Sequence, residues 1–119
     1  MTGSEAGLLN YYNFNEAAGT VLNDQTGTPG NGILTAFSGD DSEWVPTTDK
    51  PESFEYSLRF DGANDFVNVP TLAYENDFTL EAWVRLDDNN GSHTIASWDF
   101  DTSPYAAFRI TDGFAEFET

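Results

Sequence analysis

The sequence contains no cysteine, and it contains only four basic side chains against twenty-one acidic ones. Without cysteine the chain forms no disulfide bond and carries no thiol nucleophile, and the redox state of its compartment stays open. It also lacks any run of about 18 apolar residues, which excludes a transmembrane helix. Residues 1–5 have neither the basic start nor the apolar stretch of a signal peptide, so this chain shows no standard export signal.

The shortage of basic residues leaves a formal net charge of −17 at pH 7. Nucleic acid is a poor candidate partner because the basic surface that phosphate binding requires is missing, and an anionic membrane surface is excluded for the same reason. The self-repulsion of so many carboxylates must be screened or neutralised. Either the side chains collect divalent cations, or the protein works at high salt. The single lysine, Lys50, favours the second, halophilic interpretation.

The clearest pattern lies in residues 54–86, where apolar and polar side chains alternate in three segments separated by turn formers. An alternation with a period of two residues predicts β-strands that bury one face. The turn formers of residues 61–64 predict that the first two segments form a hairpin. The three strands are predicted at residues 54–60, 65–69 and 78–86.

Shorter segments of the same kind fill the rest of the chain, and none has the period of a helix. Residues 15–32 are rich in Gly, Asn, Asp and Thr, which favours turns, and residues 111–113 predict a tight reversal. Several short strands with frequent turns indicate one all-β antiparallel sandwich or barrel at residues 7–119, after a flexible leader at residues 1–6. The remaining strands are predicted at residues 8–14, 33–37, 44–46, 93–98, 105–110 and 114–118.

Several of these segments carry a family pattern. Segments starting at Leu58, Asp65 and Phe78 read LRFDG, DFVNVP and FTLEAWV, while the segment starting at Gly7 reads GLLNYYNFN and residues 24–32 read DQTGTPGNG. Together they resemble the LamG-like (laminin G / concanavalin A-like) jelly-roll domains over nearly the whole chain. The resemblance implies an antiparallel two-sheet jelly-roll sandwich and a binding role, without naming a ligand.

The resemblance also implies that the fold is incomplete at its C-terminal end. Jelly rolls of this family continue for several strands beyond the segment that matches residues 114–118, so we expect this chain to hold about the first two thirds of the fold. Either the chain is the start of a longer protein, which we favour, or strands from other copies or subunits of an assembly complete the sheet, because an uncovered edge is costly.

Glu116 and Glu118 lie two residues apart, so they project from one face of the last predicted strand. Glycoside hydrolases on related jelly rolls show an E-x-D-x-x-E pattern, which this spacing does not match, and the pair is interpreted as a solvated strand face. The single His93 has no nucleophile beside it and is interpreted as a surface residue. We therefore expect no enzymatic activity.

Calcium is a candidate cofactor, because hard cations prefer clustered carboxylate, amide and carbonyl oxygens. Three loops supply such groups, at residues 61–65, 87–90 and 99–103. A resemblance to pentraxins in the third loop implies that Asp99 and Asp101 provide about half of a calcium site. The alternative is that the acidic residues of these loops form turns through local hydrogen bonds.

Trp83 is predicted to face away from the apolar side of its strand, together with Glu81 and Arg85. An aromatic ring flanked by hydrogen-bonding side chains is a typical sugar-binding arrangement, so these three residues are the candidate ligand site. The alternative is structural, since the same tryptophan belongs to the family pattern, where it can pack under a loop.

Together these features indicate a non-catalytic recognition or adhesion module that binds a glycan or a protein surface, outside the cell or on a virion. The acidic composition and the missing export signal fit a turret or tail fibre of a halophilic virus. Two alternatives stay open: a purely structural subunit of an assembly, and a fragment of an extracellular glycan-active enzyme.

Overall fold

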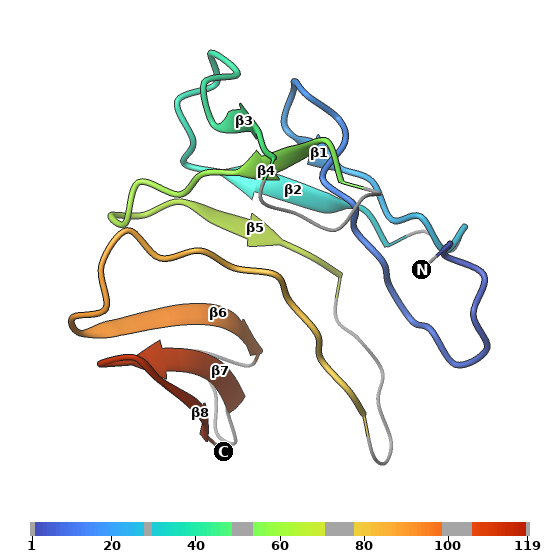
Figure 1. Ribbon diagram of the computed structural model, residues 1–119. Coiled ribbons are helices and arrows are strands. Elements are labelled where there is room, and N and C mark those ends of the chain that lie inside the picture. The colour runs from blue at the N-terminus through green and yellow to red at the C-terminus, as the bar shows by residue number, and fades with distance from the viewer. Residues whose placement is uncertain (1, 28–29, 49–53, 71–77, 99–105, 119) are drawn as a thin grey trace. The chain divides into compact units, whose positions relative to one another are not determined.

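The computed structural model describes residues 2–27, 30–48, 54–70, 78–98 and 106–118. These residues form eight strands, whose pairings are all antiparallel, and no helix (Figure 1). Within the same ranges there is accordingly no helix of the length and hydropathy that crossing a bilayer requires. The chain divides into two units, Met1–Ala73 and Tyr74–Thr119. The predicted all-β fold class is confirmed.

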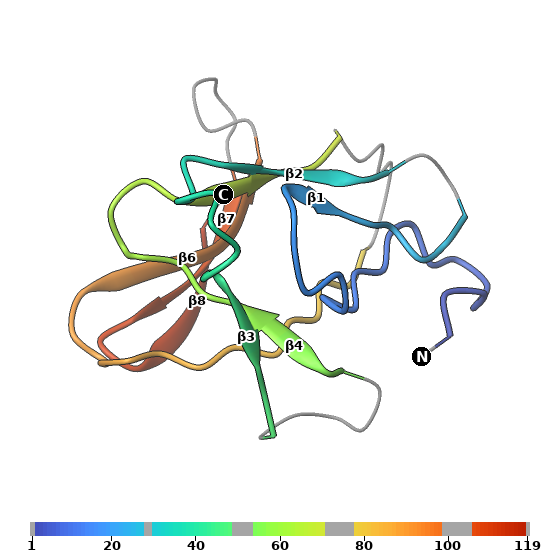
Figure 2. The same cartoon turned by 90° about the horizontal axis from the view of Figure 1, so that it is seen from above.

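The first unit contains two small sheets. In one of them β1 (Val21–Leu22), β2 (Gly32–Thr35) and β5 (Phe66–Asn68) pair in that order. In the other, β3 (Trp44–Pro46) pairs with β4 (Tyr56–Leu58). Figure 2 shows β1 and β2 side by side, with β3 and β4 together in a separate layer. The chain of this unit therefore passes to the second layer between β2 and β3 and returns to the first layer between β4 and β5.

The core of the first unit lies between its two sheets. Leu22 and Leu34 of the first sheet form a buried cluster with Trp44 of the second, and none of the three side chains is more than 6% exposed. Burial of apolar surface is the main favourable term in folding. This unit is therefore a two-sheet β-sandwich, as predicted. Partly buried side chains surround the cluster: Tyr12, Phe14, Phe37, Tyr56, Leu58 and Val67.

Strand β2 shows how the sequence builds this layer. Leu34 is buried whereas its neighbour Ile33 is 48% exposed, which is the alternation of a half-buried strand. At the start of the strand, a Cβ atom on Gly32 would lie 2.6 Å from Cγ1 of Val67, which follows Phe66 on β5. Since only glycine lacks that atom, Gly32 allows β2 and β5 to approach each other closely.

Asp24 ties the N-terminal segment to the loop before β2. Its carboxylate accepts hydrogen bonds from the Tyr11 amide (3.1 Å), the Thr26 amide (2.9 Å) and the Asn10 side chain (2.5 Å). Burial by itself raises the pKa of Asp24, but these hydrogen bonds outweigh it and hold the pKa below its ordinary value. A Cβ atom on Gly30 would overlap Nδ2 of Asn10 and Oδ2 of Asp24, so a larger residue there would displace these two side chains.

The second unit is an antiparallel meander whose three strands pair in sequence order: β6 (Ser92–Trp98), β7 (Ala106–Thr111) and β8 (Phe114–Glu118). Strands β7 and β8 are joined by Asp112 and Gly113, whose φ angles of 48° and 84° lie in the left-handed region. A two-residue turn of this kind matches the twist of a hairpin, and it confirms the predicted tight reversal. The β6–β7 register shifts between Thr94 and Ala96, as at a β-bulge.

The two faces of this sheet differ in chemistry. Phe108 on β7 pairs with Phe117 on β8, so both rings project from the same face. The Phe117 ring lies 5.9 Å from Trp98 and 6.2 Å from Phe78, measured between ring centroids. Arg109 follows Phe108 in the strand and therefore projects from the opposite face. One face of the sheet carries Phe108 and Phe117, and the other carries Arg109, Glu116 and Glu118 together with Phe114.

The predicted hairpin of residues 54–60 and 65–69 is wrong. Strand β4 pairs with β3 and strand β5 pairs with β2, so the two strands belong to different sheets. Side chains close the turn between them: the Asp65 carboxylate accepts the Asp61 amide (2.8 Å), and the Asp61 carboxylate accepts the Ala63 amide (2.8 Å). Alternation and turn formers specify two strands and a reversal, but they do not specify the partner of each strand.

Two further predicted strands, at residues 8–14 and 78–86, are corrected by the structure, which assigns no strand to either segment. In the first, the Tyr11 amide donates to the Asp24 carboxylate in place of a neighbouring strand. In the second, the predicted buried face is 42–44% exposed at Phe78, Leu80 and Val84. An amphipathic segment becomes a strand only when a neighbouring backbone pairs with it, and alternation does not report on that neighbour.

The other strands lie close to where alternation predicts them. Strands predicted at residues 33–37, 44–46, 93–98, 105–110 and 114–118 appear as β2, β3, β6, β7 and β8. Strands β4 and β5 are shorter than predicted. The prediction misses β1, which lies in the turn-rich stretch before β2 and pairs with it, because a strand of two residues shows no period.

Replacing Asp24 by asparagine is expected to lower the free energy of unfolding by about 1–3 kcal/mol at neutral pH, because partly buried donors lose a charged acceptor. The pKa of Asp24 is lowered in the folded state. Its contribution is therefore present above the unfolded-state pKa and is lost as the pH falls through the folded-state value. Urea unfolding of the wild type and of Asp24→Asn across the acid range measures the difference.

The matched control is Asp61→Asn, which makes the same charge change at an exposed turn. We expect it to change the free energy of unfolding by less than about 0.5 kcal/mol. A difference between the wild type and Asp24→Asn that stays constant into strong acid would contradict the role of the charge.

Candidate functional site

The three residues predicted to form a ligand site lie on an exposed segment of the second unit. Glu81, Trp83 and Arg85 are all exposed, and Trp83, at 74%, is the most exposed large apolar side chain among the residues described. An indole that keeps about three quarters of its surface in water contributes little to a core, so this ring is accessible to a ligand. Because residues 78–86 form no strand, the three residues lie on an extended segment and not on a sheet face.

The predicted calcium loops use their carboxylates as turn formers where the structure describes them. In residues 61–65 the two aspartates accept amides of their own loop, and in the second loop Asp88 accepts the Asn90 amide (2.8 Å). Asp99 and Asp101 lie outside the described residues, so their role stays a prediction. In the part of the chain that the structure describes, no three His, Asp or Glu side chains lie close enough together to hold a metal ion.

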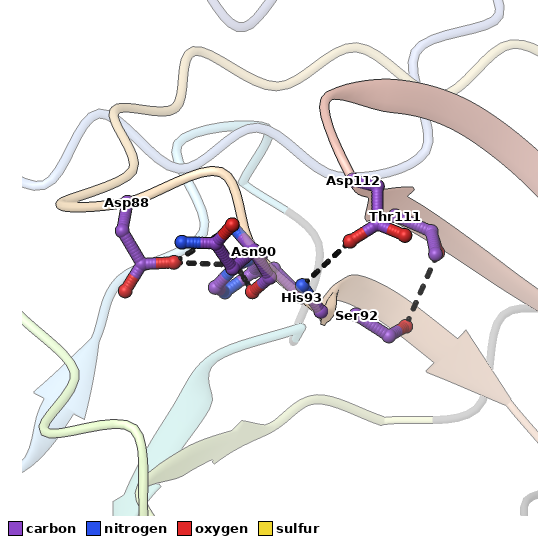
Figure 3. Close-up of polar contacts among 7 residues, drawn as sticks. Asp88, Asn90, Ser92, His93, Thr111 and Asp112 are labelled. Atoms are coloured by element: carbon purple, nitrogen blue, oxygen red, sulfur yellow. Dashed lines mark hydrogen bonds and ion pairs between the residues drawn. The ribbon is translucent and has the colours of Figure 1, made fainter.

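A cluster of polar contacts joins two loops at one end of the second sheet (Figure 3). The Gly91 amide donates to the Asp112 carboxylate (2.8 Å), and the Asp112 amide donates to the Gly91 carbonyl (3.0 Å). Beside them, Nε2 of His93 lies 3.1 Å from the Asn90 carbonyl oxygen and 3.9 Å from the Asp88 carboxylate. These contacts fix the loop before β6 to the turn between β7 and β8. His93, whose side chain is 32% exposed, is part of this junction.

Strands of the same sheet line a shallow groove of about 620 Å³. Nη1 of Arg109 lies 2.5 Å from Oε2 of Glu118 in this groove, and the two hydroxyls of Ser92 and Thr111 lie 3.4 Å apart. Strands β6, β7 and β8 all contribute to its lining. The lining residues are Ser92, Arg109, Thr111, Glu116, Phe117 and Glu118.

The groups of the groove are hydrogen-bond donors and acceptors. Arg109 lies opposite Glu116 in the ladder and forms an ion pair with Glu118, so its charge is compensated by the two carboxylates. Carboxylate oxygens, a guanidinium and hydroxyls together match the mixed donors and acceptors of a sugar. His93 lies away from the two glutamates, because it pairs with Ile110, which faces the opposite side of the sheet from Arg109.

Sequence reasoning found the two glutamates of this groove but missed Arg109. The interpretation of Glu116 and Glu118 as a strand face in contact with solvent agrees with their exposure. A two-residue turn at Asp112 and Gly113 also fixes the register of its hairpin, and that register places Arg109 opposite Glu116. Arg109 and Glu116 lie the same number of residues from the turn, and this symmetry is the sequence signal that identifies Arg109 as a neighbour of Glu116.

No family model matches the chain, and no curated protein matches it. Among solved structures the chain is similar to an S-layer domain-containing protein from Clostridium thermocellum ATCC 27405, with 27% sequence identity and a TM-score of 0.71. The match covers 91% of this chain and 49% of that one, so the chain spans about half the length of the structure that it matches. The two proteins therefore share a β fold over nearly all of this chain.

Replacing Trp83 by alanine is expected to change the free energy of unfolding by less than about 1 kcal/mol, because the side chain is mostly solvated. The matched control is Trp44→Ala. It should cost about 3–5 kcal/mol, because it empties the core of the first unit and removes the indole that donates to the Gly19 carbonyl (2.9 Å). Urea unfolding followed by circular dichroism measures both variants. Equal losses would contradict the placement of Trp83 at the surface.

Proposed function

We propose that this protein is a non-catalytic recognition or adhesion module that works at a cell surface. The observation that carries the proposal is its similarity, at 27% identity over 91% of the chain, to an S-layer domain-containing protein. The name of that protein refers to a surface layer, and a module of the same fold is expected to act in the same place. The LamG-like sequence pattern supports the same role.

The second unit offers two surfaces that support glycan binding. Trp83 presents an exposed ring that can stack on a sugar, and Glu81 and Arg85 lie two residues away on either side. The groove around Arg109 and Glu116 offers hydrogen-bond donors and acceptors. The ligand that fits these surfaces is a neutral glycan, since an acidic one would be repelled by the net charge of −17.

A second candidate function is structural, as a subunit that assembles with copies of itself or with other proteins. Strand β8 favours this alternative, because all five of its residues are exposed. Phe114 and Phe117 are 73% and 54% exposed, and apolar side chains on an open strand are typical of an interface. A virion turret or tail fibre is the finer form of this proposal, and a fragment of a glycan-active enzyme is the third alternative.

Glycan-array binding by the full chain separates recognition from assembly. We expect binding to neutral glycans that falls at least about tenfold in Trp83→Ala or in Arg109→Ala, because both remove a large contact. Phe114→Ala is the matched control for Trp83→Ala, since its ring is equally exposed, and it should bind glycans as the wild type does.

Light scattering of the same variants tests the structural alternative. Absence of glycan binding, together with self-association that Phe114→Ala abolishes and Trp83→Ala does not, would replace recognition by assembly. Turnover of a sugar polymer by the isolated chain would contradict both and favour the enzymatic alternative.

The acidic composition supports adaptation to high salt as a further part of the proposal. With a net charge of −17, repulsion between carboxylates opposes folding, and salt screens that repulsion. We expect the free energy of unfolding to rise steeply between about 0.1 M and about 2 M KCl. Thermal unfolding over a KCl series measures it, and a chain that is equally stable in dilute buffer contradicts the halophilic interpretation.

A further inference from the structure

A loop of the first unit gathers oxygen atoms that the proposed function does not use. Residues 38–43 read SGDDSE and lie between β2 and β3, where the chain crosses from one sheet to the other. Oγ of Ser38 lies 2.6 Å from Oδ1 of Asp40, 3.1 Å from Oε2 of Glu43 and 3.4 Å from Oγ of Ser42. Four side chains therefore bring oxygen atoms to one place.

These oxygens outnumber the protons that are available to them. A serine hydroxyl has one proton, yet Oγ of Ser38 is within hydrogen-bonding distance of two carboxylates. Oδ1 of Asp40 accepts the Ser38 hydroxyl (2.6 Å) and the Ser42 amide (3.1 Å). Asp40 therefore has two donors, whereas Glu43 shares with it the single proton of the Ser38 hydroxyl.

The shortage of hydrogen-bond donors is largest at Glu43. The residue is only 5% exposed, and one of its carboxylate oxygens, Oε1, is buried without a hydrogen-bond partner. The other oxygen of the same carboxylate contacts Ser38, so the group faces the oxygen cluster. A carboxylate that is buried without compensation is strongly disfavoured unless a charge is brought to it.

We propose that residues 38–43 bind a hard divalent cation, with Ca²⁺ as the best match, through the side chains of Ser38, Asp40, Ser42 and Glu43. Calcium binds about six to eight oxygens at about 2.3–2.6 Å, which places adjacent ligands roughly 3 Å apart. The oxygens of Asp40, Ser42 and Glu43 already lie at similar separations from Oγ of Ser38. Backbone carbonyls and water complete the ligand set, and the ion compensates both carboxylates, including the orphaned oxygen of Glu43.

The other acidic loops of the first unit lack this deficit. Asp61 and Asp65 each accept a backbone amide of their own loop, as Asp40 does, and the Asp24 carboxylate accepts two amides and two side chains. None of these aspartates is a buried residue with an unpartnered oxygen, as Glu43 is. The loop at residues 38–43 also differs from a site built from carboxylates alone, since serine hydroxyls supply half of its side-chain ligands. Oε2 of Glu16 also lacks a partner, but Glu16 is only partly buried, so among the described residues the need for a cation is strongest at Glu43.

The same loop holds the core in place. The Asp41 carboxylate accepts the Gly19 amide (2.7 Å), and the Asp41 carbonyl accepts the Trp44 amide (3.1 Å). The Trp44 indole in turn donates to the Gly19 carbonyl (2.9 Å). A cation bound here would stabilise the loop that connects the two sheets. Its binding is therefore measurable as an increase in the stability of the folded state.

Thermal unfolding of the full chain in a constant background of KCl, with and without CaCl₂, tests the proposal. With calcium in large excess over its dissociation constant, we expect the melting temperature to rise by roughly 5 °C or more. Asp40→Asn and Glu43→Gln should weaken calcium binding, measured by calorimetric titration, at least about tenfold, because each removes a charged ligand. Glutamine keeps the size of Glu43 and removes the buried charge, so this variant should fold without calcium.

Asp61→Asn is the matched control, and we expect it to respond to CaCl₂ as the wild type does. The proposal is overturned if CaCl₂ raises the melting temperature no more than KCl at the same ionic strength. It is equally overturned if Asp61→Asn abolishes the response to calcium while Glu43→Gln retains it.

Discussion

The packing of Trp44 between two small sheets is the contact on which the first unit depends. It forms the buried cluster with Leu22 and Leu34, so it joins the two layers. Its indole also donates to the Gly19 carbonyl, which fixes the loop before β1 to the same core. Because this core is small, apolar burial supplies only part of the stability, and polar contacts must hold the loops that cross between the layers.

Carboxylates provide many of those contacts, which gives part of the acidic composition a structural meaning. Asp24 holds the segment that contains Tyr11, Asp65 closes the loop between β4 and β5, and Asp112 joins its turn to Gly91. In each case a carboxylate replaces a backbone partner that the short strands do not supply. Hydrogen bonds to carboxylates therefore take the place of the longer backbone hydrogen-bond ladders of a larger domain. Electrostatic repulsion between the carboxylates is the result.

The sequence predicted the positions of most strands but not all of their partners. The β7–β8 hairpin was fully predictable, because Asp112 and Gly113 specify both the turn and the register. Residues 61–64 have a similar composition, yet they join strands of different sheets. A longer loop that is closed by side chains leaves the register open, and the partners of β4 and β5 come from distant parts of the sequence. Pairing is therefore decided by packing, which alternation does not encode.

Because local patterns do not encode packing between distant segments, the sequence predicted only some parts of the candidate sites. An exposed Trp83 and the pair Glu116 and Glu118 follow from local patterns, whereas the environment of Glu43 does not. Glu43 stands in a loop that reads as solvated, but it precedes the buried Trp44, and its carbonyl accepts the Arg59 amide (2.8 Å) at the end of β4. Packing of the core therefore removes this carboxylate from water and leaves its Oε1 without a hydrogen-bond partner. In a chain this acidic, the segment that places Trp44 in the core is thus also the one that buries the carboxylate of Glu43.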